Sequence, residues 1–169
     1  MGAWVALLRA VNVGGTGKLP MSALRATCEA AGFARVQTYI QSGNALFTSA
    51  LPEARVKAKL EAALGTAVLV RSASELGAIA ARSPFRDAPP NRVVVFFLDQ
   101  PPPREAIAGL GIPGREEVRA LGREVFVHYP DGQGGSKLRL PFADRATGRN
   151  LNTVSKLAEM ARALVADGG

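Results

Sequence analysis

The chain has 169 residues, enough for one ordinary domain or two small ones, and its composition of 47% hydrophobic and 21% charged residues excludes a disordered chain. Its single cysteine, Cys28, and single histidine, His128, exclude an intramolecular disulfide and the usual zinc sites. The net charge of +7 lies mainly in residues 1–72, with eight Lys or Arg against three Glu, and permits a nucleic-acid partner without establishing one.

The first half of the chain predicts six elements in the order strand, helix, strand, strand, helix, strand, which is the ferredoxin-like plan. The first apolar run, ended by Arg9, is too short for a signal peptide or a membrane span, so we expect a cytoplasmic protein without a membrane anchor. The predicted elements are Ala3–Arg9, Pro20–Ala31, Arg35–Gln41, a hairpin partner that ends at Thr48, Pro52–Leu64 and Thr66–Val70.

The second half predicts a looser repeat of this pattern after a proline-rich boundary at Ser83–Pro90. We therefore expect an α+β fold of two related ferredoxin-like (βαββαβ-type) halves packed together, with mostly antiparallel sheets. The expected domains are residues 1–82, which include a connecting helix, and residues 90–169. The predicted elements of the second half are strand Arg92–Leu98, helix Arg104–Leu110, hairpin strands Val118–Leu121 and Glu124–Tyr129 about Gly122, a short helical piece near Lys137 and helix Thr153–Val165.

Two polar segments are expected at one edge of the first sheet, because the first and second strands of a βαββαβ unit run parallel. The segment Asn12–Lys18 contains Gly14 and Gly15, can turn several backbone N–H groups inward and leads to a helix N-terminus, which suits a phosphate or carboxylate. It lacks the spacing of a Walker A loop. The hairpin segment Gln41–Asn44 offers the amides of Gln41 and Asn44 and the hydroxyl of Ser42, which orient a ligand. The alternative to a ligand site is that both segments are ordinary flexible turns, in which Asn44 is a turn residue and Lys18 is solvated.

A third polar segment, Gly148–Lys156, is predicted to open the last helix, with Asn152 or Thr153 as its cap. Arg149 there is able to contact an anion with two N–H groups. A capping loop with solvated cations remains the alternative. The neighbouring Ser136 and Lys137 do not form a catalytic pair, because adjacent helical residues do not face each other.

Four sets of motifs follow one another along nearly the whole chain: Leu7–Gly15 with Lys18, Pro20 and Met21; Tyr39–Asn44; Pro130–Gly132 with Ser136–Leu138; and Arg149–Asn150 with Asn152–Thr153. In these motifs the chain resembles domain-of-unknown-function family 1697, a bacterial family of uncharacterised proteins. The resemblance implies two related α+β halves and no established activity. The chain departs from the family pattern at Ala10, Gly148 and Leu151, where the family usually has Gly, Thr and Trp.

These segments suggest a protein that binds a small anionic or phosphorylated ligand, without a cofactor or metal. No Asp, Glu or His accompanies them, so no catalytic residue is assigned. An RNA or single-stranded nucleic-acid binding module is an alternative, although the aromatic strand signature of RNA-binding sheets is missing: Phe47 provides one ring, and Trp4 fits a core position equally well. A structural or interaction module is another, and the oligomeric state is not predicted. The candidate ligand-binding residues are Arg9, Asn12, Gly14, Gly15, Lys18, Gln41, Ser42, Asn44, Arg149 and Asn150.

Overall fold

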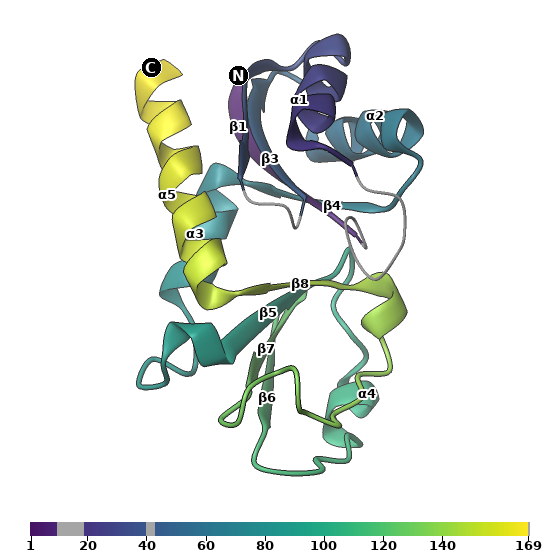
Figure 1. Cartoon of the computed structure of the whole chain (residues 1–169), viewed down its shortest axis with the longest axis vertical. Coiled ribbons are helices and arrows are strands. Elements are labelled where there is room, and N and C mark those ends of the chain that lie inside the picture. The colour runs from purple at the N-terminus through teal and green to yellow at the C-terminus, as the bar shows by residue number, and fades with distance from the viewer. Residues whose placement is uncertain (10–18, 40–42, 169) are drawn as a thin grey trace. The chain divides into compact units, whose positions relative to one another are not determined.

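The computed structural model describes residues 1–9, 19–39 and 43–168, and it shows an α+β protein with two four-stranded antiparallel sheets (Figure 1). By their contacts, Met1–Ala78 and Lys156–Gly169 form one compact unit, and Ile79–Ser155 form the other. The predicted domain ranges, 1–82 and 90–169, stay a prediction.

The first sheet has the strand order β2-β3-β1-β4, and every neighbouring pair is antiparallel. Both β1 and β2 pair antiparallel with β3, so they run parallel to each other, as the sequence predicts. The βαββαβ order of the first half is confirmed. Its elements are β1 (Gly2–Leu8), α1 (Met21–Ala30), β2 (Ala34–Tyr39), β3 (Asn44–Ser49), α2 (Glu53–Leu64) and β4 (Val68–Ser72), followed by α3 (Ala73–Ala81).

One face of the first sheet packs against α1 and α2, which lie together on it (Figure 1). The helices bury their apolar positions there, including Leu24 and Cys28 of α1 and Leu60 of α2, so the expected core role of Cys28 is confirmed. Gly65 ends α2 in the left-handed region at φ 68°, where a residue without a side chain is favoured.

The second sheet has the order β6-β7-β5-β8, which repeats the order of the first sheet strand for strand. The predicted relation between the two halves is therefore confirmed. The elements are the 3-10 helix η1 (Pro90–Arg92), β5 (Val93–Phe97), α4 (Arg104–Ala108), β6 (Glu117–Leu121), β7 (Glu124–His128), the 3-10 helix η2 (Ala143–Arg145), β8 (Thr147–Asn150) and α5 (Leu151–Gly168).

The second unit differs from the first between its last two strands. Residues 129–146, all described, contain only the three-residue η2 where the first unit has α2. The predicted helical piece near Lys137 is wrong, because that residue lies in irregular backbone. The third polar segment is not simply a loop either, since Gly148, Arg149 and Asn150 form most of β8 and pair with β5.

Candidate functional site

The end of β1 is tied to two neighbouring turns in the first unit. The backbone N–H of Leu8 donates to the carbonyl oxygen of Gly43 in the hairpin, at 2.9 Å. The N–H of Arg9 donates to Ala67 O at 3.0 Å, and the Thr66 hydroxyl donates to Arg9 O at 3.2 Å. The chain that enters the segment 10–18 is thus held between the β2–β3 hairpin and the approach to β4.

Six of the candidate residues lie outside the described residues: Asn12, Gly14, Gly15, Lys18, Gln41 and Ser42. Arg9, at the end of β1, is half-buried. Asn44 is completely buried at the start of β3, and its Nδ2 donates to the carbonyl oxygen of Tyr39 at 2.9 Å. Asn44 therefore closes the hairpin backbone, which is the structural role that the sequence left open.

Arg149 and Asn150 belong to the second unit and have structural contacts there. The buried Arg149 donates from Nη1 to Thr147 Oγ1 and to Gly148 O, each at 2.9 Å, and burial lowers the pKa of its guanidinium to about 10. It stays charged at neutral pH. The Asn150 Oδ1 accepts the N–H of Thr153 at 2.9 Å. The cap of α5 is thus Asn150 and not Asn152 or Thr153, because the helix begins at Leu151, two residues earlier than predicted.

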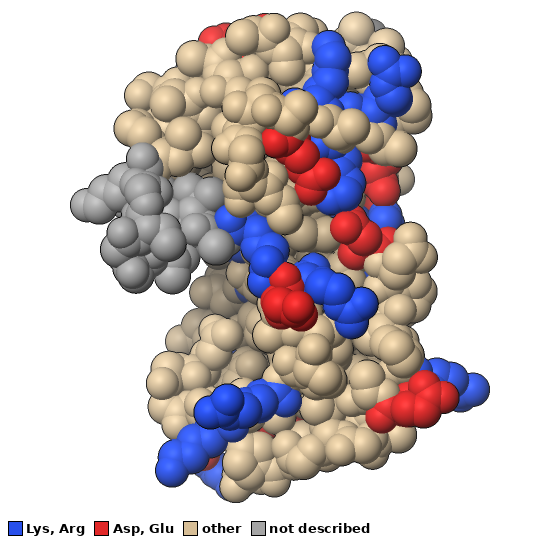
Figure 2. Space-filling model, turned by 90° about the vertical axis from the view of Figure 1, so that its right-hand side faces the viewer, with Lys and Arg blue, Asp and Glu red and all other residues tan. Residues whose placement is uncertain are grey.

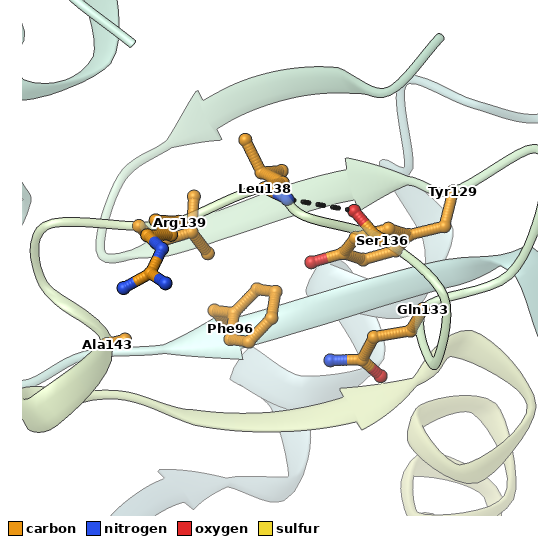
Figure 3. A pocket seen from close by; sticks show the side chains of 8 residues that line it. Phe96, Tyr129, Gln133, Ser136, Leu138, Arg139 and Ala143 are labelled. Carbon is orange, nitrogen blue, oxygen red and sulfur yellow. Dashed lines mark hydrogen bonds between the residues drawn. The ribbon is translucent and has the colours of Figure 1, made fainter. Parts of the chain in front are cut away.

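A pocket of about 540 Å³ lies in the second unit, and sequence reasoning did not find it (Figure 3). It combines apolar and polar side chains from β5, from the end of β7 and from the segment that follows. The lining residues are Phe96, Tyr129, Gln133, Ser136, Leu138, Arg139, Leu140 and Ala143. The only sequence signal near it was the motif around Pro130–Gly132 and Ser136, which named no role for these side chains.

Hydrogen bonds hold the segment that forms one wall of this pocket. The Ser136 hydroxyl donates to Glu116 Oε2 at 2.6 Å. It also accepts the N–H of Leu138 at 3.1 Å (Figure 3). The Glu116 Oε1 accepts the N–H of Gly114 at 2.9 Å. The bond from Ser136 is the main cause that lowers the pKa of Glu116 below its usual range. Glu116 therefore stays ionised and anchors the wall near neutral pH.

Tyr129 is the most buried polar residue of the pocket, at 4% exposure. Burial, followed by the charge of Glu116, raises the pKa of its phenol to about 12. The phenol therefore keeps its proton at neutral pH, so it is able to donate a hydrogen bond and does not act as a base.

The described ranges contain no group of three or more His, Cys, Asp or Glu residues able to hold a metal ion. Among the helices of those same ranges, none has both the length and the hydropathy of a membrane span.

A family model described as "Protein of unknown function (DUF1697)" matches residues 1–126, three quarters of the chain. The chain belongs to the DUF1697 family. The resemblance drawn from its motifs is confirmed.

This DUF1697 protein is similar to a solved structure described as that of the conserved bacterial protein SP0830 from Streptococcus pneumoniae. The two share 25% sequence identity with a TM-score of 0.76, over 95% of this chain and 98% of that one. No curated protein matches the DUF1697 chain. The comparisons supply a family and a fold, and they name no ligand or reaction.

Proposed function

We propose that this protein binds a small anionic ligand, a phosphate or carboxylate compound, where β1 and the β2–β3 hairpin end. The hydrogen bond from Leu8 N to Gly43 O carries the proposal, because it joins the described flanks of two polar segments. One segment is Asn12–Lys18 and the other is Gln41–Asn44. Their side chains and glycines are the ones that the sequence assigned to a ligand.

The start of α1 supports a negative partner. Its first turn has no acidic residue, and Pro20, the residue before it, makes no side-chain capping bond in the described part of the chain. The first N–H groups of a helix need such a partner, and the helix dipole favours an anion there. The excess of cations in residues 1–72 acts in the same direction.

The residues have distinct roles in this proposal. Arg9 and Lys18 supply charge, Gly14 and Gly15 let backbone N–H groups approach the anion, and the side chains of Asn12, Gln41 and Ser42 orient it. Asn44 supports the hairpin. Arg149 and Asn150 have structural contacts in the second unit, so their part in binding stays a prediction.

A small anion is favoured over a nucleic acid by the surroundings of the first unit's rings. Phe47 is completely buried and stacks on Phe33 with ring centroids 4.3 Å apart, and Trp4 packs partly buried against the same core. A base-stacking surface needs exposed rings. On the face shown in Figure 2, Asp and Glu side chains interrupt the Lys and Arg side chains, so the described surface there is not uniformly basic.

A thermal-shift screen of inorganic phosphate, nucleotides and phosphorylated metabolites tests this function. A ligand at a hundred times its Kd stabilises the protein by about 2.7 kcal/mol, which raises the Tm by about 5–10 °C for a chain of this size. The shift should disappear in Lys18→Ala. It should persist in Lys59→Ala, whose exposed lysine bonds Ala31 O from α2. If no anion shifts the wild-type Tm, or if both variants respond alike, the proposed site is wrong.

A further inference from the structure

The pocket in the second unit occupies the place of a missing helix. In the first unit, the helix α2 connects β3 to β4 along the chain. It covers one face of the sheet and buries Val56 and Leu60 there. In the second unit, the segment between β7 and β8 covers the corresponding face with Leu138, Leu140 and Phe142. This irregular covering leaves about 540 Å³ open, within the range of about 300–1,000 Å³ typical of small-molecule sites.

The floor of the pocket is the ring of Phe96, and its position depends on Gly148. The two residues are opposite each other in the β5–β8 pair. A Cβ at position 148 would lie 2.9 Å from Phe96 Cε1 and 3.2 Å from Val94 Cγ1. The glycine therefore leaves space for the ring, which remains partly exposed to the pocket (Figure 3). An exposed aromatic face of this kind stacks on another planar ring.

Three polar groups surround this floor. Tyr129 is only 4% exposed, and its hydroxyl points into the pocket (Figure 3). This hydroxyl has no hydrogen-bond partner among residues 1–9, 19–39 and 43–168. The hydroxyl itself is not enclosed, so its O–H is available to bond a ligand in the pocket. The guanidinium of Arg139 lines the same pocket without an ion pair to any described residue, and the Gln133 amide lines it as well.

We propose that this pocket binds a heteroaromatic ring that carries an anionic group, the chemistry of a nucleoside monophosphate. The ring stacks on Phe96, the hydroxyl of Tyr129 and the amide of Gln133 bond the polar edge of the ring, and Arg139 pairs with the anion. The site lies within the second unit and does not depend on the anion site proposed for the first.

Calorimetric titration with AMP tests the proposal, with adenosine and ribose 5-phosphate as the two halves of the ligand. AMP should bind the wild-type chain, and each half should bind at least about tenfold more weakly, because each lacks one of the two contacts. Arg139→Gln should weaken AMP binding about ten- to hundredfold. Phe96→Leu, which keeps an apolar side chain and removes the ring, should weaken it about fivefold or more.

One variant serves as a control, and a second separates this site from the one proposed in the first unit. Arg104→Gln removes another exposed arginine of the second unit and should bind AMP as the wild type does. Lys18→Ala reports on the other proposed site: if the first unit also takes the phosphate of AMP, this variant removes that binding event and leaves the one that depends on Arg139. Absence of AMP binding at millimolar concentration would overturn the proposal, and so would ribose 5-phosphate binding as tightly as AMP. Loss of AMP binding in Lys18→Ala but not in Arg139→Gln would place the nucleotide at the first unit's site, which supports that function and refutes this one. Arg139 is exposed, so Arg139→Gln should fold. AMP binding by this variant therefore still tests the proposal if Phe96→Leu does not fold.

Discussion

Gly148→Ala should destabilise the second unit through its contact with a single ring. The added methyl carbon would lie 2.9 and 3.1 Å from two ring carbons of Phe96 and 3.2 Å from Val94 Cγ1, whereas carbons at rest are about 3.5–4.0 Å apart. Gly148 is not among the described glycines with positive φ, so alanine fits the backbone itself. Overpacking costs about 1–3 kcal/mol, and alanine in place of glycine in a strand returns about 0.5–1 kcal/mol. We expect a net loss of up to about 2.5 kcal/mol.

Urea unfolding of a double-mutant cycle measures this contact. In the Phe96→Val background the ring is absent, so the cost of Gly148→Ala should fall, with a coupling of about 1 kcal/mol between the two sites. Gly111→Ala is the matched control, because its Cβ would meet nothing within 4 Å, and it should change stability by less than about 0.5 kcal/mol. If Gly148→Ala costs the same with and without the ring, or stabilises the wild type, the account of the pocket floor is wrong.

Three further predictions concern the first unit. Asn44→Ala should lower the free energy of unfolding in urea by about 1–3 kcal/mol, because it removes the buried donor of a β2 carbonyl; an unchanged stability would contradict its role in the hairpin. Burial raises the pKa of the Cys28 thiol to about 11, so near pH 8 only about one thiol in a thousand is ionised. Its alkylation by iodoacetamide should follow global unfolding, and a rate like that of free cysteine would disprove this. Burial acts to raise the pKa of Glu61, but hydrogen bonds from Lys57 and from the N–H of Val68 outweigh it and lower this pKa below its usual value. The resulting stability is present above the ordinary glutamate pKa of about 4.3 and is lost as the pH falls. Glu61→Gln should therefore lower the free energy of unfolding in urea at neutral pH, and its difference from the wild type should narrow near pH 4. A difference that stays constant with pH would refute this role of Glu61.

The first unit was predictable because its elements carry local signals at both ends. Pro20 precedes α1, and Gly65 ends α2 in the left-handed region. The strand β8 had no such signal. Thr147–Asn150 is short and polar, without an apolar alternation. It becomes a strand by pairing with β5, 50 to 56 residues earlier in the chain.

The pocket was not predictable for a related reason. Phe96 lies in the apolar run of the predicted strand Arg92–Leu98, and nothing in that run shows that its ring lies against position 148, where a Cβ would come within 2.9 Å of it. Tyr129 and Arg139 come together with Phe96 through an irregular segment, for which periodicity offers no rule. The sequence shows that Gly148 departs from the family pattern, but it does not show that Phe96 lies opposite this glycine.

Amide NMR of the ¹⁵N-labelled protein titrated with inorganic phosphate tests the central claim most directly. If the first unit binds anions where β1 and the hairpin end, the N–H signals of Leu8, Gly43 and the glycines Gly14 and Gly15 should shift together and saturate, and they should stay in place in Lys18→Ala. Signals that do not move at saturating phosphate, or that move equally in the variant, would contradict the claim.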